Sequence, residues 1–152
     1  MPSKVRITKN GILCEVNEKR VYLDPKKTDL NAINFVSHAH SDHLPSKNGG
    51  TILSSIETSA ISNLRGFTME NHVESLDGFS LIDSGHVLGS KGLLFDDIFY
   101  TGDICTRDRG FLKAAKIPSC KTLITECTFG LPEFQFPKMN EIQTYVNQLI
   151  SD

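Results

Sequence analysis

Residues 38–43, with the sequence HAHSDH, place three histidines and one aspartate within six positions of a chain that has only five histidines. Neutral imidazoles and carboxylates are ligands of zinc and its first-row neighbours, and no cysteine lies nearby to supply a thiolate. The mostly apolar residues 33–36 predict a short buried strand, and Pro45 ends the segment. The cluster is therefore predicted to form a metal site in a loop at a strand end, the alternative being a solvated loop that is rich in histidine.

The spacing within the cluster predicts how its ligands divide. In an extended backbone, residues two apart project to the same side, so His38 and His40 can share one ion. After a turn at Ser41, Asp42 and His43 are free to face a second ion. The whole segment resembles the His-x-His-x-Asp-His signature of the metallo-β-lactamase superfamily.

Length and composition indicate one globular domain or part of one. The 152 residues are 39% hydrophobic and 22% charged, with a formal charge of -2, so binding to a polyanion would need a local basic patch. No apolar run approaches the roughly 20 residues that span a bilayer, and no apolar signal segment begins the chain. The four cysteines are scattered, which favours reduced thiols and a cytoplasmic location.

Three short apolar stretches between residues 5 and 23 predict an antiparallel meander. Asp24, followed by Pro25, ends the third stretch. On its own this aspartate is equally well explained as a turn former. The resemblance implies a second role, because superfamily relatives place an aspartate here to accept the outer N–H of a metal-bound histidine.

After the cluster, residues 51–53 predict a strand and residues 57–65 a helix that stops at Gly66. His72 follows without a partner ligand or a glycine-rich context, so we expect a surface histidine. Residues 79–82 predict another strand, which leads into His86 between Gly85 and Gly89. Flanking glycines allow close backbone approach, so His86 is either a metal ligand or a loop histidine that caps the backbone.

The segment GHVLGS at residues 85–90 resembles the corresponding motif of the β-CASP nuclease branch of the superfamily. The resemblance implies that His86 completes a first zinc site with His38 and His40. Residues 92–101 predict a hairpin that delivers Gly102 and Asp103 at a strand end. By the same resemblance Asp103 bridges two zinc ions, the alternative being an aspartate in a turn.

Basic residues gather just after Asp103. Between residues 105 and 121 the chain carries five basic side chains and one acidic side chain, a net charge of +4. They are Arg107, Arg109, Lys113, Lys116 and Lys121 against Asp108. A solvated face is the ordinary explanation of such a run, and contact of Arg107 and Arg109 with a nucleic-acid backbone is the alternative.

A predicted strand over residues 121–125 ends in ECTFG, residues 126–130. This resembles the Glu-x-Thr-Tyr/Phe-Gly motif that β-CASP nucleases place before an inserted second domain, and the prolines at 132 and 137 resemble archaeal mRNA 3′-end-processing enzymes and ligase-associated DNA exonucleases. An amphipathic helix is predicted over residues 141–150. The resemblance implies that residues 1–152 are the amino-terminal half of the metallo-β-lactamase domain, ending before that insert and before the last histidine of the second metal site.

The expected fold is therefore α/β: the amino-terminal half of an αββα sandwich, with one mostly antiparallel sheet, metal loops at its strand ends and helices outside. The resemblance implies zinc-dependent phosphodiester hydrolysis with two Zn²⁺ per complete protein, in which Asp42 orients the nucleophile and Glu126 helps to protonate the leaving oxygen. RNA is the expected substrate and partner, with single-stranded DNA second. The alternatives are a thioester or lactone hydrolase and a non-catalytic scaffold in a processing complex or homo-oligomer.

Overall fold

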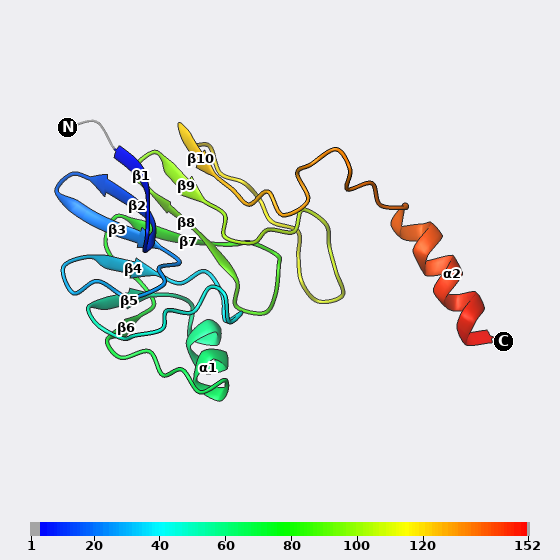
Figure 1. The fold of residues 1–152 in the computed structure, drawn as a ribbon, viewed down its shortest axis with the longest axis horizontal. Coiled ribbons are helices and arrows are strands. Elements are labelled where there is room, and N and C mark those ends of the chain that lie inside the picture. Colours follow the sequence, from blue (N-terminus) through cyan, green and yellow to red (C-terminus); the bar gives the residue numbers. More distant parts are fainter. Residues whose placement is uncertain (1–3, 152) are drawn as a thin grey trace.

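The computed structural model describes residues 4–151, which form two β-sheets and two α-helices (Figure 1). The first sheet has the spatial order β1 (Lys4–Thr8), β2 (Gly11–Val16), β3 (Lys19–Leu23), β4 (Ile33–Phe35), β5 (Thr51–Leu53) and β6 (His72–Val73). The second has the order β10 (Thr122–Ile124), β9 (Ile98–Tyr100), β8 (Lys91–Phe95) and β7 (Phe79–Asp83). The helices are α1 (Ile56–Leu64) and α2 (Met139–Ser151). The mixed α and β content agrees with the expected class.

The expectation of one mostly antiparallel sheet was wrong. The meander β1–β2–β3 is antiparallel as predicted, but β3, β4, β5 and β6 pair in parallel, and β9 pairs in parallel with β10. Parallel neighbours are joined by long crossover connections rather than tight turns. Short hairpin turns reveal strand direction in a sequence, whereas crossovers do not, and this is why the meander and the β8–β9 hairpin were predicted correctly and the parallel pairs were not.

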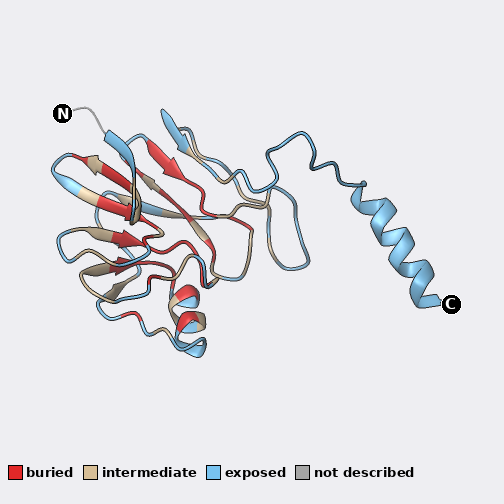
Figure 2. Cartoon of the chain, viewed as in Figure 1, coloured by how far each residue is buried: buried red, intermediate tan, exposed pale blue. Residues whose placement is uncertain are grey.

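The hydrophobic core lies between the two sheets. It joins buried residues of both sheets, and in Figure 2 the buried parts of the strands are red along the body of the molecule. Its fully or almost fully buried members are Cys14, Val16, Val21, Leu23, Phe35 and Leu53 from the first sheet, and Leu93, Phe95, Ile98 and Tyr100 from the second. The two sheets therefore pack face to face.

Helix α1 begins and ends where the sequence indicates. The Ser55 side chain accepts a hydrogen bond from the Thr58 backbone N–H as the N-cap, and Gly66 follows the last turn with a φ of +85°. Its buried residues are the polar Thr58 and Ser62, whereas the apolar Leu64 is 87% exposed. The helix is thus anchored through hydroxyl groups, and the Ser55 hydroxyl also donates to Gly89 O.

Close contacts between the sheets bring the polar loops together. A Cβ on Gly102, whose φ is +56°, would lie 2.6 Å from the Ser37 Cβ, so only glycine lets the end of β9 approach the loop after β4 this closely. The Lys91 N–H at the start of β8 donates to Ser37 O over 2.9 Å. The loops that follow β4, β7 and β9 therefore meet at one edge of the molecule.

The carboxy-terminal part is built differently. No residue from 125 to 151 is buried, and α2 lies at the end of an extended segment, away from both sheets (Figures 1 and 2). The helix matches the amphipathic pattern predicted from residue 141 onward. Over the residues that the structure describes, neither helix has the length and apolar character needed to cross a bilayer.

Candidate metal centre

Four predicted ligands converge at the edge where the loops meet. The His38, His40, His86 and Asp103 side chains each place one donor atom within 4.8 Å of the others, and this group could bind a metal ion. His40 Nδ1 lies 2.9 Å from His38 Nε2 and 3.3 Å from His86 Nε2, and Asp103 Oδ2 lies 3.4 Å from His86 Nε2. Donors about 2.0–2.1 Å from a tetrahedral zinc would lie about 3.3–3.4 Å apart, so the spacing fits such an ion.

Hydrogen bonds to Ser37 set the tautomer of His38. The Ser37 hydroxyl lies 2.6 Å from Asp24 Oδ2 and 2.9 Å from His38 Nδ1. A carboxylate only accepts hydrogen bonds, so the single hydroxyl hydrogen goes to Asp24 and the hydroxyl oxygen accepts from His38 Nδ1–H. The Nε2 lone pair of His38 is then free and directed toward the cluster, as a metal ligand requires.

Asp24 accepts hydrogen bonds from several residues at this edge of the molecule. Its Oδ1 accepts from the Ser37 backbone N–H at 2.7 Å, and its Oδ2 accepts from the Tyr100 hydroxyl at 2.8 Å and from His43 Nδ1 at 2.7 Å. A carboxylate in contact with a histidine of the cluster is the arrangement that the resemblance implied. Asp24 has a φ of +41°, a conformation that aspartate tolerates better than most residues, which also fits the turn-former interpretation.

A second set of donors lies beside the first. His43 Nε2 is 3.3 Å from Asp103 Oδ1 and 3.6 Å from Asp42 Oδ2. Asp103 therefore turns one oxygen toward His38 and His86 and the other toward His43. The Asp42 side chain is 78% exposed, so this second set has three donors and opens to solvent.

Burial prepares two of the imidazoles to act as neutral ligands. Burial, followed by the charges of neighbouring histidines, lowers the pKa of His38 to about 3, and burial also lowers the pKa of His86. Burial would lower the pKa of His43 too, but the hydrogen bond and charge of Asp24, with Asp103 and Asp42, raise it above its ordinary value. Metal binding needs deprotonated nitrogens, so the first set is better prepared than the second.

Arg109 makes contacts within the fold that the sequence did not indicate. Its guanidinium donates to Gly85 O at 3.1 Å and to His86 O, and so fixes the loop that carries His86. Arg107 is exposed, and within residues 4–151 its side chain has no hydrogen bond or ion pair. Of this pair, only Arg107 keeps a guanidinium free for a partner.

Glu126 lies at the edge of the same region, at the end of β10. Its Oε1 accepts from the Ile104 backbone N–H at 2.8 Å, and its Oε2 accepts from the Thr128 hydroxyl at 2.7 Å. Because Ile104 directly follows Asp103, this carboxylate fixes the backbone beside a candidate ligand.

Two residues of the site were missed in the sequence, and one was interpreted too simply. Tyr100 and Ser37 were not singled out, although a tyrosine in a buried strand needs a partner for its hydroxyl. His72 was expected at the surface, but it lies half-buried in β6, where its Nε2 is 3.1 Å from Ser54 O. It is not among the residues of the metal cluster.

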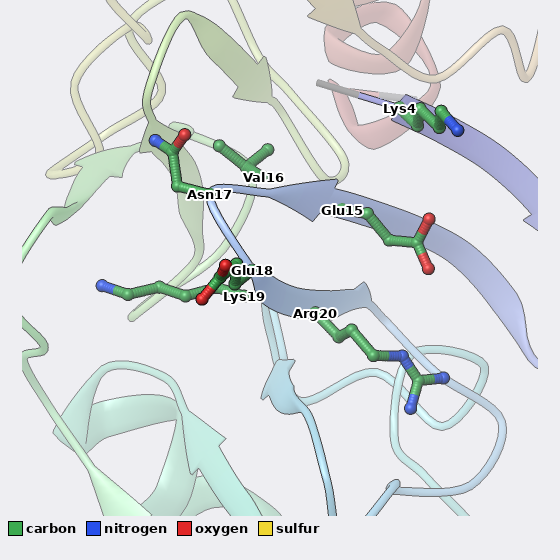
Figure 3. A pocket seen from close by; sticks show the side chains of 7 residues that line it. All are labelled: Lys4, Glu15, Val16, Asn17, Glu18, Lys19 and Arg20. Carbon is green, nitrogen blue, oxygen red and sulfur yellow. The ribbon is translucent and has the colours of Figure 1, made fainter. Parts of the chain in front are cut away.

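A hollow of about 210 Å³ lies elsewhere, at the β2–β3 turn (Figure 3). Lys4 and residues 15–20 line it, and their charged side chains spread around the strands in Figure 3 without converging on one point. Its lining includes no histidine or cysteine. The hollow therefore has no link to the metal cluster.

Comparison with known proteins found no matching family model. One curated relative, a "Probable DNA ligase" from Opitutus terrae, is 31% identical over an alignment of 137 residues. The alignment covers 78% of this chain and 13% of that protein. The chain is thus similar to a small part of the relative and spans about an eighth of its length.

Proposed function

We propose that this chain carries the metal centre of a nuclease that hydrolyses DNA phosphodiester bonds with zinc, and that it belongs to the β-CASP branch of the metallo-β-lactamase superfamily. The observation that carries the proposal is the convergence of His38, His40, His86 and Asp103, with donors spaced for one ion. HAHSDH, GHVLGS and ECTFG all follow strand ends, and two sheets packed face to face suit the amino-terminal half of an αββα sandwich.

DNA is the favoured substrate because of the relative. From the sequence alone RNA was preferred, on the likeness to mRNA-processing enzymes. The one curated relative reported above is named a probable DNA ligase, and ligase-associated DNA exonucleases were the second possibility that the motifs suggested. The name of the relative therefore places DNA before RNA as the proposed substrate, while the proposed reaction remains phosphodiester hydrolysis.

The residues divide the work of hydrolysis among themselves. When bound, zinc would polarise the scissile phosphate and lower the pKa of a water molecule that acts as nucleophile. Asp103 faces both donor sets, and Asp42 and His43 are the residues that would hold a second ion. Asp24 keeps the Nε2 of His43 directed at Asp103, because it accepts from the opposite ring nitrogen.

Asp42 and Glu126 have different freedom to take part in proton transfer. Asp42 is largely exposed, so its carboxylate can turn to hold the attacking water. Both oxygens of Glu126 already accept a hydrogen bond, from the Ile104 N–H and the Thr128 hydroxyl, so this carboxylate is fixed in place. Glu126 is thereby assigned first to positioning the backbone after Asp103.

Metal titration with a matched pair of histidine variants tests the proposal. We expect His40→Ala to weaken zinc binding by more than about 100-fold, beyond the usual cost of losing an outer-shell partner, and to abolish cleavage of labelled DNA. His72→Ala removes a histidine outside the cluster and should leave zinc content unchanged. The tighter of two zinc equivalents should belong to the four-donor set, with the second bound more weakly.

Elemental analysis and calorimetric titration of the purified chain give the zinc stoichiometry, and a cleavage assay with DNA and RNA gives the activity. Equal zinc binding by the wild type and His40→Ala would overturn the metal centre. If the protein binds zinc and cleaves thioesters or RNA but not DNA, the proposal of a metal centre stands and the proposal of DNA as substrate is wrong.

A further inference from the structure

An aromatic side chain stands at the tip of the loop that follows Asp103. Arg109 and Leu112 exchange two backbone hydrogen bonds of 2.9 Å, which makes a tight turn with Gly110 and Phe111 at its apex. Gly110 has a φ of +57°, and the Phe111 side chain is 79% exposed. A two-residue turn leaves its apex without neighbours, so this exposure follows from the backbone.

The loop is held firmly despite its exposure. Asp108 accepts from the Ala114 N–H at 2.8 Å and pairs with Lys113 at 3.1 Å. At its base, the Cys105 N–H donates to Ser84 O, and the Ala115 N–H donates to Cys105 O, both over 2.8 Å. Phe111 is therefore presented by a closed loop rather than by a free segment, which lowers the entropy cost of using it in binding.

This loop packs directly on the loop that carries His86. A Cβ on Gly85 would lie 2.7 Å from both Cys105 O and Lys113 O, so the two backbones touch where only glycine fits. The Arg109 guanidinium, two residues before Phe111, donates to His86 O. The position of Phe111 is thus tied to a candidate metal ligand through one side chain.

A hollow of about 250 Å³ is lined by residues of both loops. Phe111 and Leu112 line one side, and Val87 and Leu88 line the other. Acidic and basic side chains also line it, namely Glu57, Asp83, Lys91 and Lys113. A lining that combines apolar side chains with charges of both signs suits a flat, uncharged group with polar edges better than it suits a phosphate.

We propose that Phe111 stacks on an unpaired base of the DNA strand whose phosphodiester lies at the metal centre, with the free guanidinium of Arg107 on a neighbouring phosphate. A rigid aromatic beside a cationic side chain is the pattern by which proteins hold single strands. The inference rests on the proposed function and narrows its substrate to single-stranded DNA, since stacked neighbours cover both faces of a base inside a duplex.

A tryptophan reporter reads this contact without any need for catalysis. The chain contains no tryptophan, so Phe111→Trp introduces a single fluorophore at the stacking position. Leu30→Trp is the matched control, because Leu30 is 78% exposed and lies in the loop that enters β4, at the end opposite to His38. Oligothymidylate should quench the fluorescence of the first variant and leave that of the second unchanged.

Binding measurements complete the test. We expect Phe111→Ala to weaken binding of a labelled oligothymidylate by about 5- to 150-fold, the range that corresponds to one lost stack. The salt dependence of binding should keep its slope in this variant, because a stack releases no counterions. Arg107→Ala should instead lower the log–log slope by about 0.7. An abasic oligonucleotide of equal length should bind Phe111→Ala and the wild type alike.

Each outcome decides between the two proposals. Equal affinity of the wild type and Phe111→Ala for oligothymidylate, or equal quenching of the Phe111→Trp and Leu30→Trp variants, would overturn stacking even if the protein cleaves DNA. Tighter binding to duplex DNA than to single strands would overturn it too. If the wild type cleaves no substrate in any assay, but oligothymidylate still quenches the Phe111→Trp variant, the stacking site stands and the proposed hydrolysis is wrong.

Discussion

The body of the molecule, residues 4–124, and its carboxy-terminal segment, residues 125–151, have similar fractions of apolar residues but bury them to different extents. In the body, large side chains such as Phe35 and Phe99 are almost completely buried. In the segment, the Phe129 ring contacts those of Phe134 and Phe136 at centroid distances of 5.5 and 5.1 Å, yet the three side chains stay 43–64% exposed. Apolar content therefore does not by itself make a core.

The two helices repeat this contrast. Helix α1 buries Thr58 and Ser62, whereas α2 has the clearer apolar stripe and buries no residue, with Tyr145 62% and Leu149 60% exposed. The amphipathic pattern predicted both helices. It did not reveal whether a partner surface lies within reach, since that depends on how the chain around the helix is routed.

The largest expected difference between the two regions comes from a pair of phenylalanine variants. Phe35→Ala should lower the free energy of unfolding by about 3–5 kcal/mol, because Phe35 is fully buried between the sheets and its ring meets that of Tyr100 edge-on. Phe136→Ala should change it by less than about 0.5 kcal/mol, since that side chain is 64% exposed. Urea denaturation followed by circular dichroism measures both values. Equal losses of unfolding free energy in the two variants would show that the body and the segment do not differ in this way.

A pair of tyrosine variants compares the same two regions, with a smaller expected change in the free energy of unfolding. Burial and the nearby Asp24 raise the pKa of Tyr100 above its ordinary range, so its hydroxyl keeps the proton that it donates to Asp24. Tyr100→Phe should cost about 1.5 kcal/mol, the lower end for a bond to a charged group, because Asp24 keeps its other donors. Tyr145→Phe in α2 should have no measurable effect. A Tyr100→Phe protein as stable as the wild type would show that the other hydrogen bonds to Asp24 are sufficient to stabilise this edge of the molecule.

The sequence predicted the candidate metal ligands better than the contacts that support them. His38, His40, His86 and Asp103 could be picked out because each lies in a short motif at a strand end. Tyr100 lies in a strand, where a tyrosine is ordinary, and its contact with Asp24 joins residues 76 positions apart. Such a pairing follows from the packing of the second sheet on the first, which no local pattern encodes.

The fold, too, was predictable where local sequence signals mark it and not where it depends on long-range pairing. The ranges of β4, β5, β7, β10 and α1 were expected within two residues, because turns and caps mark them. The presence of two sheets was not expected, because the parallel pairing of β4 with β5 and of β9 with β10 depends on crossovers. Arg109 shows the same limit at a single residue: its charge suggested a phosphate, whereas the fold gives it two carbonyl groups.

Removal of α2 is expected to have the smallest effect on the body. A chain that ends after residue 138 loses no buried residue and no core contact, so its free energy of unfolding should stay within about 0.5 kcal/mol of the full chain. It should also associate less in solution, because the exposed Tyr145, Leu149 and Ile150 go with it. Denaturation and light scattering on both chains measure the two effects. A loss of more than about 1 kcal/mol would mean that in solution α2 packs against the sheets, and the apolar stripe would then belong to the core after all.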